Sequence, residues 1–309
     1  ISKAMALALS GFADYFEHRR PDALLVLGDR YETLAVCSAA LNAQIPIFHL
    51  YGGETTEGAI DEAIRHSITK MSYLHFTSTE VYRKRVIQLG ESPNRVFNVG
   101  AIGVENALNL DLLSYEQLEE SLGAKIPKPF AVMTYHPVTL DNCDPVGKQS
   151  EVLKVVVAFI ATKANADAGG RAINEALEEF ARHNNNFMLF DSLGSLRYLS
   201  ALSNAAFVLG NSSSGLLEAP AFFVPTINVG DRQRGRVFPE SVINCDENAD
   251  AINKAIGQAM DSEFRSRLHG MQNPYGQGDS SRQIVDVVID AMKHPIDLKK
   301  KFYDVDFDL

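Results

Sequence analysis

The stretch Phe48–Lys70 concentrates residue types that can carry out acid–base chemistry. It places Glu54, Glu57, Asp61 and Glu62 within nine positions, directly after a Gly-Gly turn. Carboxylates held this close repel one another and their pKa values separate, which suits a pair acting as acid and base. An acidic first helical turn that complements the helix dipole is an equally good interpretation of these residues alone. The chemical interpretation is favoured because several other predicted strand ends carry residues of the same kind.

Chemically useful side chains follow six predicted strands, at the point where each strand ends. In open parallel sheets, ligands bind beyond the carboxyl ends of the strands. The segments are Asp29-Arg30, His49 with the turn Gly52–Glu54, Tyr135–Pro137, Lys163–Asn165, Gly210–Gly215 and Gly230–Arg232. The polarity of loops does not account for six such coincidences, so we expect the site at this edge of the predicted sheets.

The segment Gly210–Gly215, with the sequence GNSSSG, predicts an anion-binding loop. It leads into a helix, and the free N–H groups of a helix N-terminus together with three hydroxyls suit a diphosphate. A serine N-cap is the lesser explanation. Glu218, one turn into that helix, is placed to accept hydrogen bonds from a ribose diol. Arg232, Arg234 and Arg236 supply positive charge for phosphates, although a loop in solvent accounts for at least one of them.

The residues that follow the Gly-Gly turn predict an amphipathic helix. Its apolar residues recur at helical spacing as a buried stripe, formed by Ile60, Ile64, Ile68 and Met71. Glu57, Asp61 and Arg65 share the neighbouring stripe, where the arginine partly offsets the repulsion between the two acids. Gly58 inside this helix costs about 1 kcal/mol relative to alanine, which is tolerable if a ligand must come close. His66 is as good a candidate for a structural hydrogen bond as for the site.

Alternating strand and helix signals predict an α/β protein. In the first half, short apolar runs indicate strands at Ala23–Leu27, Ile45–Leu50, Tyr73–Thr77 and Arg95–Val99. After a linker within residues 124–129 the pattern restarts, with strands near Phe130–Met133, Val155–Thr162, Phe187–Phe190, Ala206–Leu209, Thr226–Val229 and Val242–Asn244. Strands separated by helices of ten or more residues are typical of βαβ units and parallel sheets.

This organisation predicts two doubly wound, Rossmann-like domains with a cleft between them. The first covers residues 1–124 and the second, the nucleotide-binding domain, covers residues 125–295. A tail, residues 296–309, is expected to pack back on the first domain. Because the chain begins with Ile1 inside a predicted helix, we also expect it to be incomplete at its N-terminus.

Composition and the absence of several motifs narrow the class of protein. The 309 residues are 46% hydrophobic and 22% charged, which fits a soluble globular protein with two cores. The net charge of -10 argues against nucleic acid and anionic membranes as partners. No apolar run approaches the ~20 residues of a membrane span. The chain has neither GxGxxG nor GxxxxGK[ST], so redox and NTPase chemistry lack support.

The cysteines indicate a reducing compartment. Cys37, Cys143 and Cys245 lie far apart and form no CxxC motif. This usage fits a cytoplasmic protein and neither a disulfide framework nor a zinc site. The histidines and acids also lack the spacing of metal ligands, so we expect no metal.

Five motifs in a fixed order then give the chain a family resemblance: GDR, GGETTEGAIDEAIRHSITK, MTYHPVT, TKANAD and GNSSSGLLEAP. Over nearly its whole length the chain resembles the hydrolysing UDP-N-acetylglucosamine 2-epimerases of sialic acid biosynthesis. The resemblance implies a GT-B fold and conversion of UDP-N-acetylglucosamine and water to UDP and N-acetylmannosamine. It further implies a homo-oligomer, a dimer or a tetramer, that needs no cofactor.

The resemblance also implies roles for individual residues. Asp29 and Asp61 correspond to the catalytic carboxylates, with Glu54 close enough to assist, and the roles of acid and base stay open between them. The residues implied to bind UDP are His136, Lys163, Ser212, Ser213, Ser214, Glu218 and Arg232.

Three departures from the family pattern affect this interpretation. Tyr51 stands where some members have a glutamate, whose role must be absent here or moved, for example to Glu54. The family's opening strand, with its Gly-Thr-Arg-Ala-Asp loop, is missing, and the region 147–162 is shorter than expected. A chain that truly lacks both stretches is expected to be inactive.

Four alternatives stay open on the sequence. The nearest is the same reaction on UDP-2,4-diacetamido-2,4,6-trideoxyglucose, the legionaminic acid route, because the motifs hold UDP and carbons 1 and 2 of the sugar. A non-hydrolysing epimerase is disfavoured by the ETTEGAIDE form of the acidic segment. A GT-B glycosyltransferase would need an acceptor groove. A non-catalytic UDP-sugar-binding regulator would have no use for clustered carboxylates.

Overall fold

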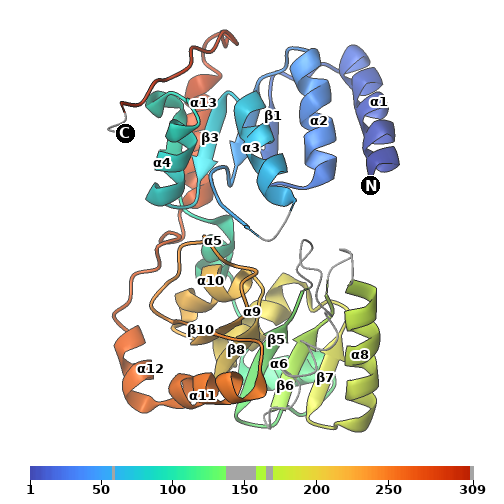
Figure 1. Cartoon of the computed structure of the whole chain (residues 1–309), viewed down its shortest axis with the longest axis vertical. Helices are drawn as coiled ribbons and strands as arrows, with labels where there is room; N and C mark the ends of the chain where they lie inside the picture. Colours follow the sequence, from blue (N-terminus) through green and yellow to red (C-terminus); the bar gives the residue numbers. More distant parts are fainter. Residues whose placement is uncertain (58–59, 137–157, 165–169, 307–309) are drawn as a thin grey trace. The chain divides into compact units, whose positions relative to one another are not determined.

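The computed structural model describes residues 1–57, 60–136, 158–164 and 170–306, and the chain divides into two compact units (Figure 1). Unit 1 comprises Ile1–Thr56, Ile60–Glu105 and Tyr275–Leu309, and unit 2 comprises Glu57–Ala59 and Asn106–Pro274. Each unit is built on one parallel sheet covered by helices, so the predicted α/β class is confirmed.

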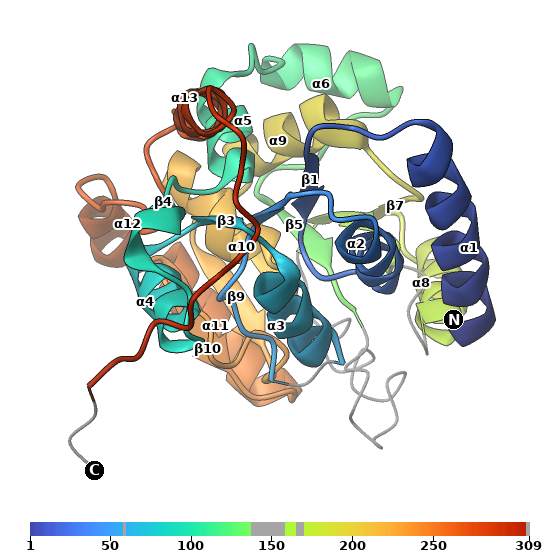
Figure 2. The ribbon, with the colours of Figure 1, turned by 90° about the horizontal axis from the view of Figure 1, so that it is seen from above.

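Unit 1 contains a four-stranded parallel sheet in the order β1-β2-β3-β4. Its strands are β1 (Leu24–Leu27), β2 (Ile47–Leu50), β3 (Leu74–Thr77) and β4 (Val96–Asn98), the last preceded by the 3-10 turn η1 (Pro93–Arg95). The helices are α1 (Ser2–His18), α2 (Tyr31–Asn42), α3 (Asp61–Met71), α4 (Glu80–Gln88) and α13 (Ser280–Ala291), while α5 (Ile102–Asn109) runs across the boundary between the units. In Figure 2, α1 lies outside α2 at the edge of this unit.

The core of unit 1 lies on both faces of its sheet. Successive strand residues point to opposite faces. Accordingly, Ile47 packs with Cys37 and Ile68 on the side of α2 and α3. Its neighbour Phe48 packs with Phe76 and with Ile284 of α13. The sheet is therefore positioned by helices from both ends of the chain.

Unit 2 contains a six-stranded parallel sheet in the order β10-β9-β8-β5-β6-β7. The strands are β5 (Phe130–Thr134), β6 (Ala158–Thr162), β7 (Phe187–Phe190), β8 (Phe207–Gly210), β9 (Thr226–Val229) and β10 (Val242–Cys245). The helices are α6 (Tyr115–Leu122), α8 (Gly170–His183), α9 (Gly194–Asn204), α10 (Ser214–Leu217), α11 (Ala249–Met260) and α12 (Ser262–Leu268), with the 3-10 turn η2 (Ala219–Phe222). Two apolar clusters fill the two faces, and α6 and α9 lie side by side over one of them (Figures 1 and 2).

The units differ from the domain boundaries expected from sequence. The expected boundary after residue 124 lies inside unit 2, because Leu118 of α6 is buried against Phe130 of β5 in that unit's core. Helix α13 was expected in the second domain, but Ile284 packs on the sheet of unit 1, so the chain returns to unit 1 at Tyr275. The tail after α13 also contacts unit 1, where Lys300 donates to Glu91 at 2.9 Å.

The acidic helix begins later than expected. Helix α3 starts at Asp61, so Glu57 precedes it and does not share a helical stripe with Asp61 and Arg65. Ile60, expected in the buried stripe, is 48% exposed, whereas Ile68 is fully buried. The predicted helical position of Gly58 and the short region 147–157 lie outside the described residues.

No helix within the described ranges has the length and apolar character needed to cross a membrane.

Candidate active site

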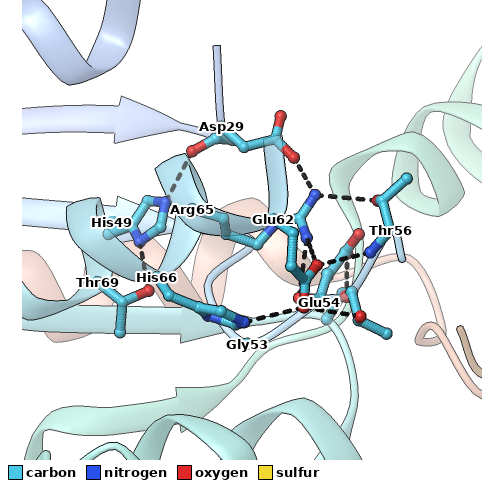
Figure 3. Close-up of polar contacts among 12 residues, drawn as sticks. Asp29, His49, Gly53, Glu54, Thr56, Glu62, Arg65, His66 and Thr69 are labelled. Atoms are coloured by element: carbon cyan, nitrogen blue, oxygen red, sulfur yellow. Dashed lines mark hydrogen bonds and ion pairs between the residues drawn. The ribbon is translucent and has the colours of Figure 1, made fainter. Parts of the chain in front are cut away.

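A buried arginine lies at the carboxyl end of the unit 1 sheet. Arg65 of α3 is 1% exposed, and its guanidinium donates to the carboxylate of Asp29, which follows β1 (Figure 3). The same side chain donates to the carbonyl of Glu54 at 2.9 Å and to the hydroxyl of Thr56 at 3.2 Å. Arg65 therefore joins the loop after β1 to the loop after β2.

Glu62, one turn before Arg65, is the second hub of this site. Its Oε1 accepts from Thr55 at 2.8 Å and faces His66 Nε2 at 3.1 Å, while its Oε2 accepts from Thr56 N–H at 2.7 Å and from Arg65 at 3.1 Å. Burial opposes the charge of this carboxylate, but these hydrogen bonds and the charge of Arg65 outweigh it and lower the pKa of Glu62. Glu62 is therefore ionised at neutral pH.

His49, on β2, fixes the turn that carries Asp29. Its Nε2 lies 2.8 Å from the carbonyl oxygen of Gly28, and a carbonyl can only accept, so Nε2 carries the proton. Nδ1 then accepts from the hydroxyl of Thr69 at 3.3 Å. Complete burial lowers the pKa of His49 to about 3, so the ring is neutral and acts as a structural link.

The other two expected catalytic carboxylates, Glu54 and Asp61, lie in the loop after β2 and at the start of α3. Glu54 is 5% exposed, and its Oε1 accepts from the hydroxyl of Ser78 at 2.7 Å. Asp61 is the first residue of α3 and is half-buried. Asp29 and Glu54 share Arg65 as a partner, the latter through its backbone carbonyl.

In unit 2, the ends of β5 and β8 are locked together by one side chain. The Oδ1 of Asn211 accepts from the backbone N–H of His136 at 2.7 Å, and its Nδ2 donates to the carbonyl of the same residue at 2.8 Å. The backbone oxygen of Asn211 in turn accepts from Arg232 at 3.3 Å and from Gln233 at 2.7 Å. Three of the expected site segments thus meet at Asn211.

The serine loop leads into one short turn of helix. Ser214 begins α10, which ends at Leu217 and continues as η2, so the expected longer helix is divided in two. The hydroxyl of Ser214 accepts from Tyr198 of α9 at 2.8 Å, and Ser212 accepts from the N–H of Ser214 at 3.4 Å. Burial raises the pKa of Tyr198 to about 12, which keeps its proton available for this bond.

Glu218 and Lys163 have contrasting environments. Burial raises the pKa of Glu218 to about 7, and its Oε2 has no partner among the described residues. Lys163 instead lies 2.5 Å from Asp191 and 2.7 Å from Glu178, and these two carboxylates raise the pKa of its ammonium group. A ligand anion would have to compete with them for Lys163.

A cavity of about 520 Å³ brings several of these side chains together within unit 2. That volume is in the range of small-molecule sites. Its lining includes His136, Lys163, Tyr198, Ser212 and Ser214.

Four residues that organise these sites were not among the predicted catalytic or UDP-binding residues: Glu62, Arg65, Tyr198 and Asn211. Glu62 and Arg65 belong to the acidic segment, and their positions on one turn of α3 were the available signal. Asn211 lies inside the GNSSSG motif, in which only the serines were predicted to bind a ligand. Tyr198 carries no sequence signal of its own.

Within the described part of the chain, no group of three or more His, Cys, Asp or Glu side chains is placed to hold a metal ion.

The fold defines the class of protein, which is a two-unit α/β protein of the GT-B type. The chain belongs to the UDP-N-acetylglucosamine 2-epimerase family, whose sequence profile matches residues 1–289. It is 42% identical to a GDP/UDP-N,N'-diacetylbacillosamine 2-epimerase (hydrolyzing) of Campylobacter jejuni, over 99% of this chain and 80% of that protein. It is 41% identical to polysialic acid biosynthesis protein P7 of Escherichia coli, over 99% and 79% of the two chains.

Solved structures agree with this fold. The crystal structure of the UDP-GlcNAc 2-epimerase of Neisseria meningitidis bound to UDP-GlcNAc matches with a TM-score of 0.78 and 19% identity, over 93% of this chain and 81% of that chain.

Proposed function

We propose that this protein is a hydrolysing 2-epimerase that converts UDP-N-acetylglucosamine and water to UDP and N-acetylmannosamine. The observation that carries the proposal is the placement of Asp29 against a buried arginine at the strand ends, in a chain of the epimerase family. A protein that only bound the nucleotide sugar would not need carboxylates gathered there.

The reaction consists of an elimination followed by an addition. The C2 hydrogen is barely acidic until the bond between C1 and the UDP oxygen breaks and C1 gains oxocarbenium character. UDP leaves with the electron pair of that bond, a carboxylate takes the C2 proton, and the electrons of the C2–H bond form the C1–C2 double bond of a glycal. Water next adds its oxygen to C1 and gives one proton to a carboxylate, while C2 receives a proton on the opposite face, which inverts that centre.

Each of the predicted site residues is assigned a role in this reaction. Asp29 and Asp61 carry the proton transfers, with Glu54 assisting, and each acid–base group of this kind contributes roughly 10²–10⁴-fold to the rate. His136, Ser212, Ser213 and Ser214 hold the diphosphate. Glu218 accepts the ribose hydroxyls, and Lys163 and Arg232 supply positive charge.

A second substrate is favoured by a specific observation. The relative that is 42% identical carries the name of a diacetylbacillosamine 2-epimerase, and its name includes both GDP and UDP. The same elimination and hydration would operate on UDP-2,4-diacetamido-2,4,6-trideoxyglucose, because C4 and C6 of the sugar take no part in the chemistry.

The test is to incubate the protein in D₂O with UDP-N-acetylglucosamine, with the UDP-diacetamido sugar and with its GDP counterpart. Free N-acetylmannosamine that carries deuterium at C2 is the expected product. Free sugar without deuterium contradicts the elimination route. Turnover of the diacetamido sugar alone replaces the proposed substrate with the second candidate, and turnover of none of the three contradicts an epimerase function.

A further inference from the structure

The carboxylate of Glu62 has no capacity left for a substrate proton. An ionised carboxylate offers about four lone-pair sites in two pairs. Both oxygens of Glu62 already have two partners: Thr55 and His66 at Oε1, and Thr56 N–H and Arg65 at Oε2. A group that acts as a base needs a free lone pair directed at the substrate. Glu62 is therefore unsuited to proton transfer, although it lies beside Asp61 in the sequence.

The four contacts instead connect the two segments that surround the Arg65 side chain. Thr55 and Thr56 belong to the loop after β2. His66 and Arg65 belong to α3 (Figure 3). Glu62 thus ties the loop to the first two turns of the helix. The same guanidinium nitrogen that donates to Glu62 donates to the Glu54 carbonyl, and its neighbour donates to Asp29. Shifting Glu62 would shift the partner of Asp29.

Complementing the helix dipole does not explain these contacts. Any acidic residue in the first turn of α3 would serve the dipole without such contacts, and Asp61 already lies in that turn. Partial burial of Glu62 with two protein donors on each oxygen is more than that role requires. His66 adds a directional constraint, because its Nδ1 is buried without a partner among the described residues, which assigns its proton to the Nε2 that faces Glu62.

We propose that Glu62 is a positioning residue of the 2-epimerase reaction, which holds Arg65 against Asp29 and does not itself transfer a proton. The inference rests on the proposed function and deepens it. It gives the two adjacent acids of the segment different roles: Asp61 contacts the substrate, and Glu62 orients the arginine.

The experiment compares Glu62→Leu and Glu62→Gln with Glu80→Leu and Glu80→Gln. Glu80 is a matched control, because it pairs with Arg83 at the same i,i+3 spacing and a similar distance of 3.2 Å, but on the exposed surface of α4. For each variant, kcat and KM for the sugar that the wild type turns over are measured together with the Kd for UDP. Displacement of a positioned group by about 1 Å can cost on the order of 100-fold in rate.

We expect Glu62→Leu to lose about 100-fold in kcat, with KM and the UDP Kd within about twofold of wild type. The amide oxygen of Glu62→Gln can still accept from Thr56 and Arg65, while its NH₂ group can donate to the hydroxyl of Thr55, which can switch to accepting. This variant should therefore recover a large part of the lost rate and keeps the test valid if the leucine variant does not fold. The Glu80 variants should match wild type.

Two results would overturn the inference while the proposed function stands: Glu62 variants as active as the Glu80 controls, or loss of UDP binding in proportion to kcat. Wild-type protein that turns over none of the sugars overturns the proposed function, and the role of Glu62 with it.

Discussion

The side chain of Asn211 forms two hydrogen bonds with the backbone of His136, one to its N–H at 2.7 Å and one from Nδ2 to its carbonyl at 2.8 Å. The two residues are 75 positions apart, and each follows a strand of the same sheet, β8 and β5. An amide is the only neutral side-chain group of this size that offers a donor and an acceptor side by side. The contact therefore fixes the histidine relative to the serine loop.

Asn211→Ala should weaken UDP binding by about tenfold and lower the free energy of unfolding by about 1–3 kcal/mol, because two backbone groups lose their partners. Asn211→Asp should be at least as harmful, since its second oxygen would face the His136 carbonyl. Calorimetric titration with UDP and thermal unfolding measure the two effects. Asn184→Ala is the control, because the side chain of Asn184 donates to the carbonyl of Phe180 at its own helix terminus, at 2.8 Å. Unchanged UDP affinity in Asn211→Ala would contradict the link.

Lys163 leads to a prediction of tighter binding. Its ammonium group is shared between Asp191 at 2.5 Å and Glu178 at 2.7 Å, and it lines the cavity with His136. Asp191→Asn removes one competing charge, so the Kd for UDP should fall about twofold to fivefold at low salt, in line with exposed ion pairs. The gain should disappear at high ionic strength. Asp290→Asn, which removes a similar exposed partner from Lys293, should leave the Kd unchanged. Weaker binding in Asp191→Asn would indicate that the pair positions Lys163.

Much of the fold follows from local signals in the sequence. The bounds expected for Phe187–Phe190 and Thr226–Val229 are those of β7 and β9. Helix starts also have local signals where a capping residue is present: before α11, the side chain of Asn248 accepts from Ala251 N–H at 2.9 Å. Helix α3 lacks this signal, because its N-cap residue Ile60 forms no side-chain cap hydrogen bond.

The site was less accessible to prediction, for a physical reason. Strand-end motifs indicate which segments meet, and Asp29, Glu54, His136 and the serines were proposed as site residues in this way. Which side chains contact one another depends on distances in the folded chain, such as the 36 positions between Asp29 and Arg65. Arg65 looked like a partner for acids on its own helix, but its burial and its contact with the loop after β1 are tertiary features. The return of α13 to unit 1 is tertiary as well, because an amphipathic helix does not reveal which sheet it covers.

Glu218 makes ligand binding and stability respond to pH in opposite directions. Its pKa is raised from the ordinary value of 4.5 to about 7, so the folded protein binds a proton that the unfolded chain has lost. The stabilisation that this gives is complete below pH 4.5 and is lost as the pH rises through 7. Relative to Glu218→Gln, the wild type should lose roughly 1–3 kcal/mol of unfolding free energy over that range. Thermal unfolding of both proteins between pH 5 and about 8 gives the difference.

Binding should show the converse. A ribose diol donates to the ionised carboxylate, so affinity for uridine should increase as the pH rises toward about 8. Uridine is the right ligand because it lacks the diphosphate, which titrates in the same range. Glu218→Gln should bind uridine weakly and without this pH dependence. A wild-type affinity that is flat between pH 6 and about 8 would show that Glu218 does not contact the ribose.

The C-terminal tail is held by a buried carboxylate in unit 1. Glu91 is 1% exposed and accepts from Lys70 at 2.6 Å and from Lys300 at 2.9 Å, and it lies 3.2 Å from His75. Burial opposes its charge, but these partners outweigh it and lower the pKa of Glu91 to about 2.

Lys300→Met should therefore lower the free energy of unfolding by about 1–3 kcal/mol, because a buried charge loses one of its partners. Tyr303, whose N–H donates to the Gly90 carbonyl at 2.9 Å, should be released as well. Urea unfolding measures the first effect, and amide hydrogen exchange at Tyr303 measures the second. Lys293→Met, which removes only an exposed partner of Asp290, is the control and should change neither.

The stabilisation by Glu91 is present above pH 4.5 and is lost as the pH falls through 2, so the difference in unfolding free energy between wild type and Lys300→Met should shrink in acid. A difference that stayed constant below pH 4.5 would show that Lys300 stabilises the tail through contacts other than Glu91.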